Sequence, residues 1–245
     1  MKKVLSLLLI TLGTLQSIDV NAEMLFRPRA SVGVAKYELS FLDQTQGSIT
    51  DTSYLTLGAG ITLASGRTFL DLSVGTSLGG QHDYTANGQT EVFQRTDFAG
   101  TLGYVLNSSM SVFAGFKSGS SYFENPTANS SYMSFNSSGL FGGASLSLRL
   151  GTDVLSLNGA LALMNGTLVD DDQTINHFNE KANTVGVSVG ASYVINLSKE
   201  SGFILKGSLQ SYSFANWSGN YSDNNNLSDL KESIVSGNLA YFVNY

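Results

Sequence analysis

Residues 184–195, TVGVSVGASYVI, alternate between two kinds of side chain with little error. The odd positions from Val185 to Ile195 are apolar, and the even positions from Gly186 to Ser192 hold only glycine and serine. Successive side chains of a β-strand point to opposite faces, so this segment is predicted to be a strand with one apolar face and one face of small residues. The same alternation recurs in four other segments: residues 55–63, 70–78, 146–150 and 155–163.

Weaker alternating segments raise the predicted total to about ten strands, with eight and twelve as open alternatives. The predicted strands are residues 29–42, 52–64, 67–79, 92–106, 110–117, 138–150, 153–164, 182–196, 202–214 and 231–245. Connections of two to five residues alternate along the chain with connections of nine to twenty residues. Short turns at one end and long loops at the other are typical of an up-and-down antiparallel barrel that crosses a membrane.

A secreted β-sandwich would also have one apolar face on each strand, so alternation alone does not identify a barrel. Two further features favour the barrel. The apolar face is aliphatic over about nine to eleven residues per strand, which is the length that crosses a bilayer at a tilt. The other face carries glycine, serine, alanine and threonine, where a soluble surface would carry long charged side chains. We predict an all-β fold with one transmembrane β-barrel.

The first 22 residues have the layout of a secretory signal peptide. Lys2 and Lys3 give a positive start, residues 4–15 are largely apolar, and Ala22 ends a small-residue cleavage site. We therefore expect residues 23–245 to form the mature barrel as a single domain. The chain has no cysteine and no run of about 20 apolar residues, so neither a disulfide nor a membrane-spanning helix is expected.

The last predicted strand keeps its alternation up to the final residue. Its apolar face holds Val235, Gly237, Leu239, Tyr241, Val243 and Tyr245. This ending resembles the C-terminal signal of bacterial outer-membrane β-barrel proteins, with Leu239, Tyr241, Val243 and Tyr245 as the assembly signal. That family most often ends in Phe and has Gly five residues earlier, where this chain has Tyr245 and Ala240.

The resemblance implies a place in the bacterial outer membrane. Its implied partners are membrane lipid, lipopolysaccharide and the barrel assembly machinery. An even number of strands would put both termini in the periplasm and the long loops outside. The resemblance does not identify an activity, and the oligomeric state stays open.

The few charged residues, 13% of the chain, fall into two groups. The predicted loops carry one clear base, Lys181, and many acids: Asp43, Asp51, Asp83, Glu91, Glu124, Asp170, Asp171, Asp172, Glu180, Asp223 and Asp229. The predicted inward face carries five bases and two acids: Arg29, Arg95, Lys117, Arg149, Lys206, Asp71 and Asp97. Basic side chains on a pore wall favour anions, whereas paired charges can brace a filled interior. The glycine and serine on this face leave volume, so a plugged lumen and a narrow water-filled path both remain open.

The two histidines lie in predicted outer loops beside acids. His82 precedes Asp83, and His177 follows the run from Asp170 to Asp172. A histidine paired with a carboxylate can serve as a general base, and the omptin family of ten-stranded surface proteases places Asp and His at the outer mouth. The chain has neither the length nor the clustered motifs of that family. The aspartate run lacks the spacing and the glycine of a calcium loop, so no metal or other cofactor is predicted.

Aromatic residues near the predicted strand ends indicate two girdles at the membrane interfaces. The periplasmic girdle would hold Tyr104, Tyr193, Tyr241 and Tyr245, and the outer girdle Tyr122, Phe123, Tyr212, Phe214 and Trp217. Nucleic-acid binding is not expected, because the formal net charge is −6 and no basic cluster exists.

Three function classes fit these observations. The leading hypothesis is a non-enzymatic envelope or porin-like barrel with acidic extracellular loops. The first alternative is an adhesin or receptor that binds through residues 120–137 and 215–228, which are rich in Tyr, Phe, Asn and Ser. The second alternative is an outer-membrane hydrolase that uses the loop histidines and aspartates.

Overall fold

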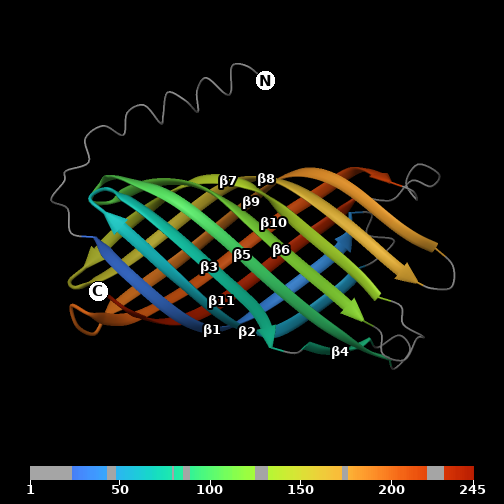
Figure 1. Cartoon of the computed structure of the whole chain (residues 1–245), viewed down its shortest axis with the longest axis horizontal. Coiled ribbons are helices and arrows are strands. Elements are labelled where there is room, and N and C mark those ends of the chain that lie inside the picture. Colours follow the sequence, from blue (N-terminus) through green and yellow to red (C-terminus); the bar gives the residue numbers. More distant parts are fainter. Residues whose placement is uncertain are drawn as a thin grey trace, which may run out of the picture.

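The computed structural model describes residues 24–42, 48–78, 80–84, 89–124, 132–172, 176–219 and 229–245. The predicted signal peptide lies outside these ranges. The described residues form strands and no helix (Figure 1). The strands are β1 (Leu25–Phe41), β2 (Ser48–Ser65), β3 (Thr68–Leu78), β4 (Gly80–Tyr84), β5 (Gln89–Asn107), β6 (Met110–Glu124), β7 (Tyr132–Leu150), β8 (Asp153–Asp172), β9 (Asn176–Asn196), β10 (Ser201–Gly219) and β11 (Leu230–Val243).

The strands form one closed antiparallel sheet in which strands that follow one another in the sequence pair with each other. The first and last strands close the barrel, with β1 paired to β11 from Arg29 opposite Phe242 to Phe41 opposite Leu230. The short β4 pairs with β5 beyond the stretch that pairs with β3, so β3 and β4 act as one barrel strand. The structure is therefore a ten-stranded up-and-down barrel, and the predicted fold class is confirmed.

One end of the barrel has tight turns, the start of β1 and the C-terminus (Figure 1), and we call it the turn end. Gly66 and Gly151 have positive φ angles of 58° and 68° in two of these turns, a backbone conformation that glycine adopts without a steric penalty. We call the opposite end the loop end. There the strands run further than predicted. The structure extends β6 to Glu124, begins β7 at Tyr132 and continues β8 to Asp172. The predicted loops 118–137 and 165–181 are thus strand over most of their length.

The outer surface carries a belt of exposed aliphatic side chains. On β9 the belt runs from Val185 to Ile195, with Val185 64% exposed, and Leu163 on β8 is 65% exposed. A soluble protein rarely exposes such a continuous apolar surface, and a bilayer provides the apolar surroundings that it needs. The belt therefore marks the part of each strand that crosses the membrane. No helix in the described ranges is long and apolar enough to cross a membrane.

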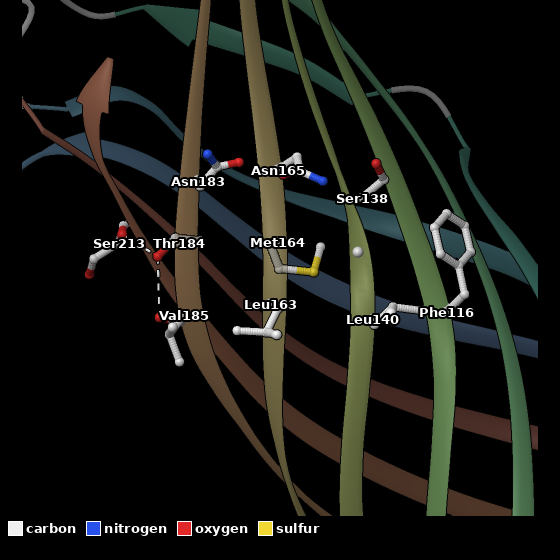
Figure 2. Close-up of a pocket in the computed structure, with 11 residues that line it drawn as sticks. Phe116, Ser138, Leu140, Leu163, Met164, Asn165, Asn183, Thr184, Val185 and Ser213 are labelled. Carbon is white, nitrogen blue, oxygen red and sulfur yellow. Dashed lines mark hydrogen bonds between the residues drawn. The ribbon is translucent and has the colours of Figure 1, made fainter. Parts of the chain in front are cut away.

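The belt has a sharp edge toward the loop end. Leu140, Leu163 and Val185 lie opposite one another on β7, β8 and β9 and form the last apolar row. The next row toward the loop end on the same outer face consists of Ser138, Asn165 and Asn183, which also lie opposite one another. Figure 2 shows the two rows, which border a surface groove of about 810 Å³. The change from aliphatic to amide and hydroxyl side chains places the membrane interface between them.

The two faces of the barrel wall exchange their polarity at this edge. Within the belt, Leu205 of β10 faces outward and Lys206 faces into the barrel. Further along the same strand, Ser213 is exposed, and Tyr212 and Phe214 are buried inside. The loop-end part of the barrel is therefore built like a soluble protein, with a polar exterior and an apolar interior.

This exchange corrects the predicted outer girdle. Phe123, Tyr212, Phe214 and Trp217 are buried in the interior and do not face lipid. The girdle at the turn end differs, because Tyr104, Tyr241 and Tyr245 are exposed there, Tyr245 to 75%. An aromatic near a strand end does not by itself indicate which face of the wall it occupies.

Candidate functional site in the barrel lumen

The loop-end half of the lumen is filled by a continuous cluster of buried side chains, which we call the plug. Side chains from β1, β2 and each of the strands β5 to β11 contribute to it. Its members are Ala35, Tyr37, Leu39, Tyr54, Phe93, Phe123, Phe135, Ala162, Met164, Leu168, Ala182, Tyr212, Phe214, Trp217, Leu230 and Ile234. Because these side chains come from strands all around the barrel, they meet across the lumen.

Aromatic rings form the centre of the plug. The ring of Phe93 lies 5.4 Å from that of Tyr37, 5.0 Å from that of Tyr54 and 5.4 Å from that of Phe123, all in tilted arrangements. Phe135 meets Phe214 edge to face at 5.2 Å. These distances lie in the range where aromatic pairs attract beyond their buried area. The rings thus fill this level of the lumen with well-packed contacts.

A buried ion pair crosses the plug. The Arg95 side chain on β5 is 1% exposed, and its Nη1 lies 3.0 Å from Oε1 of Glu232 on β11, which is fully buried. Arg95 Nη1 also donates to Ser121 Oγ at 2.6 Å, and Nη2 donates to Asp97 Oδ1 at 2.8 Å. The guanidinium stands 4.7 Å from the centre of the Tyr37 ring. A buried charge is tolerated only with such partners, so this network ties β1, β5, β6 and β11 together.

A second polar contact joins β6 to β10 at the base of the plug. Lys117 Nζ donates to Gln210 Oε1 and to the Tyr212 hydroxyl, and it lies 4.4 Å from the centre of the Tyr212 ring. The ammonium group therefore contacts neutral acceptors and an aromatic face, with no carboxylate bonded to it among the described residues.

Between the plug and the turn end lies a polar cavity of about 680 Å³. Its wall carries many Ser and Thr side chains and five of the predicted lumen charges: Arg29, Asp71, Asp97, Lys117 and Lys206. Arg29 binds Asp71 through two nitrogens, at 2.7 and 2.8 Å, and Thr62 Oγ1 donates to the same carboxylate at 2.6 Å. This cavity lies at the depth of the belt.

The other charged residues occupy different places. Arg95 lies in the plug, and Arg149 is exposed near the turn between β7 and β8. Glu180 was expected on the acidic rim, but it is fully buried. Asp51 is on β2 and pairs with Lys36 on the outer face at 3.0 Å.

Glu232 was not identified from the sequence. It occupies an even position on β11 like Leu230 and Ile234, whose side chains face the interior, and it is the charged residue in that apolar series.

Five inward aromatic rings lie opposite a glycine. Phe69 pairs with Gly103, Phe113 with Gly143, Phe141 with Gly115, Tyr212 with Gly186 and Phe242 with Gly202. A Cβ built on any of these glycines would come within 2.9 Å of the facing ring. The glycines therefore make room for rings, and part of the volume expected on the inner face is filled.

Only backbone positions are described for the loop-end His and Asp candidates. His82 and Asp83 lie on β4, and Asp170 to Asp172 end β8. Asp171 stands opposite His177 in the β8–β9 ladder. Within the described ranges, no three His, Asp or Glu side chains are grouped so that they could hold a metal ion.

No protein-family model and no curated protein sequence matches the chain. Among solved structures, the outer-membrane protease OmpT from Escherichia coli is similar, with a TM-score of 0.58 and 10% identity over 94% of this chain and 99% of that one. The translocator domain of the autotransporter NalP from Neisseria meningitidis has a TM-score of 0.51 and 11% identity over 100% of this chain and 95% of that one. At such identities the likeness concerns the fold alone. Together with the lipid-facing belt, it shows that the chain shares the transmembrane β-barrel fold of these two bacterial outer-membrane proteins.

Proposed function

We propose that this chain is a sealed, non-catalytic outer-membrane barrel that acts through the surface of its loop end. The observation that carries the proposal is the plug. A solute crossing the barrel would have to pass the level of Phe93, Arg95 and Glu232, whose side chains are almost completely buried. Of the two alternatives for the lumen, this favours the plugged one and argues against a porin.

The proposed orientation puts the turn end in the periplasm and the loop end outside the cell. Short turns on the periplasmic side and long connections on the outer side are the usual arrangement of such barrels. The loop-end part of the strands, with its polar exterior, would then project beyond the membrane. A sealed lumen leaves this outer part as the surface that can contact other molecules.

Conductance across a planar lipid bilayer tests the sealed lumen. The purified barrel should insert without discrete current steps. A Tyr37→Ala/Phe93→Ala double variant removes two adjacent rings of the plug and should show steps or frequent flickering. Val187→Ala, a change of similar kind on the lipid face, serves as the matched control and should stay silent. Stable steps from the unaltered protein would refute the proposal.

Adherence of cells that display the barrel tests the outer surface. Shortening residues 125–131 and 220–228 leaves every strand intact and should remove any adherence that the barrel confers. Unchanged adherence after both changes would exclude these two connections as the contact surface.

A hydrolase is the second candidate, and one observation favours it. Asp171 and His177 are direct cross-strand neighbours at the loop end, so a carboxylate and an imidazole stand on facing backbone positions. Peptide and lipid hydrolysis by the purified barrel should be compared with hydrolysis by His177→Ala and by His82→Ala. Loss of activity in His177→Ala alone would establish the hydrolase, and equal background activity in all three would exclude it.

A further inference from the structure

Lys206 places a cation in the middle of the barrel. Its side chain is exposed to the polar cavity, and it makes no ion pair or hydrogen bond with any described residue. The neighbouring outward residues Leu205 and Leu209 belong to the lipid-facing belt, so the ammonium group lies at membrane depth. A charge at this depth is costly unless another group compensates it.

The acids nearby are already engaged. Both oxygens of Asp71 are bound by Arg29, and Thr62 adds a further hydrogen bond. Asp97 and Glu232 both bind Arg95. Among the charged residues that line the cavity, three bases (Arg29, Lys117 and Lys206) face two acids (Asp71 and Asp97). The ammonium of Lys117 donates to Gln210 and Tyr212, so among the three cavity bases Lys206 is the one without a hydrogen bond to a described residue.

Two further donors flank Lys206. In the sheet register, Lys206 lies directly between Ser192 on β9 and Asn238 on β11. The Asn238 Oδ1 accepts a hydrogen bond from Thr56 Oγ1 at 3.1 Å, which leaves the amide NH₂ group to donate. Ser192 makes no hydrogen bond through its side chain with any described residue. Side chains opposite one another on neighbouring strands stand about 5 Å apart, so the three donors can converge on one small group.

We propose that Ser192, Lys206 and Asn238 form a binding site for an oxyanion, the phosphate or carboxylate group of a small polar solute. An ammonium group bounded by a hydroxyl and an amide offers charge-assisted and neutral hydrogen bonds to several oxygens at once. The cavity of about 680 Å³ is far larger than a single ion needs and falls in the range of small-molecule sites. The hydroxyl-rich wall suits a hydrated or hydroxylated solute.

Equilibrium dialysis with radiolabelled inorganic phosphate tests the site. The refolded barrel in detergent at low ionic strength should bind one phosphate per chain, and Lys206→Gln should lower the affinity at least about tenfold, because it removes the charged donor. Lys206→Arg should retain binding. Lys36→Gln changes a lysine on the outer face and is the matched control, which should bind like the unaltered protein.

Competition defines the ligand class. Acetate should displace the labelled phosphate if any oxyanion fits, and displacement by phosphate esters alone would restrict the class to phosphates. Displacement by an equal concentration of chloride would overturn the oxyanion assignment, as would equal binding by the unaltered protein and Lys206→Gln. Heat-modifiable migration on a gel verifies folding. If Lys206→Gln fails to fold, a Ser192→Ala/Asn238→Leu double variant, which keeps the charge, should weaken binding, and unchanged binding would refute the site.

Discussion

Tyr212 lies directly across the β9–β10 ladder from Gly186, and its ring occupies the space that a side chain at Gly186 would need. A Cβ at Gly186 would lie 1.9 Å from Cδ1 of Tyr212. The phenol oxygen of the same tyrosine accepts a hydrogen bond from Lys117 on β6. One glycine on β9 thus determines where a ring from β10 can rest and how it meets a third strand.

Gly186→Ala should destabilise the barrel by about 1–3 kcal/mol, the usual cost of overpacking a filled interior. The measurement is urea unfolding in phospholipid vesicles. Gly159→Ala is the control, because a Cβ there meets nothing within 4 Å, and it should change the stability by less than about 0.5 kcal/mol. Adding Tyr212→Leu to Gly186→Ala should recover part of the loss, because the ring no longer collides with the new methyl group. Equal effects of the two alanine variants would contradict the ring-over-glycine packing.

Arg95→Met should destabilise the barrel more than Glu232→Gln. Removing the arginine leaves the Glu232 carboxylate buried without its cationic partner, which typically costs about 3–5 kcal/mol. Glu232→Gln keeps a carbonyl oxygen for Arg95, which also remains paired with Asp97, so about 1–2 kcal/mol is expected. The same unfolding assay ranks the two variants. The opposite order would show that water reaches the Glu232 carboxylate when Arg95 is absent.

An arginine scan along β9 should locate the belt edge. Val189→Arg places a charge near the middle of the apolar stretch and should cost about 2–4 kcal/mol, whereas Asn183→Arg lies beyond the edge and should cost about 0–1 kcal/mol. Unfolding from vesicles measures both. A similar loss at the two positions would mean that the membrane interface does not lie between Val185 and Asn183.

Trp217, the single tryptophan, reports on the plug. Its side chain is 9% exposed and its ring centre lies 6.2 Å from that of Phe214. Its fluorescence should be blue-shifted and weakly quenched by acrylamide, and Phe214→Ala should increase the quenching. Phe203→Ala alters a ring that pairs with Tyr241, outside the plug, and should leave the quenching unchanged. Strong quenching in the unaltered protein would contradict a sealed plug.

The sequence predicts the membrane-spanning part of this barrel well, and the reason is visible in β9. Between Val185 and Ile195 one face meets lipid and the other meets the cavity, so a single alternation describes the whole stretch. The turn-end limits of the strands follow from glycine-containing turns such as the one at Gly151. These features depend only on residues that are close together in the sequence, so a local sequence pattern is enough to predict them.

The loop-end part could not be predicted in the same way. Around Ser138 to Leu140 the apolar residues move from the inner to the outer face. A stretch of sequence that spans this point therefore shows no regular alternation of apolar and polar residues, and it suggests a loop. The ion pair between Arg95 and Glu232 joins residues 137 positions apart. No local pattern relates them, because the closure of the barrel alone brings them together. The same holds for Ser192, Lys206 and Asn238, which the strand register aligns.

The seam between β1 and β11 has a consequence for assembly. Tyr37 comes from one side of the seam, Glu232 from the other, and their common partner Arg95 from β5 on a different part of the wall. None of these contacts can form while the first and last strands are apart. The plug is thus completed only when the first and last strands meet, and the lumen of any open intermediate would lack the contacts of Arg95 with Tyr37 and Glu232 until then.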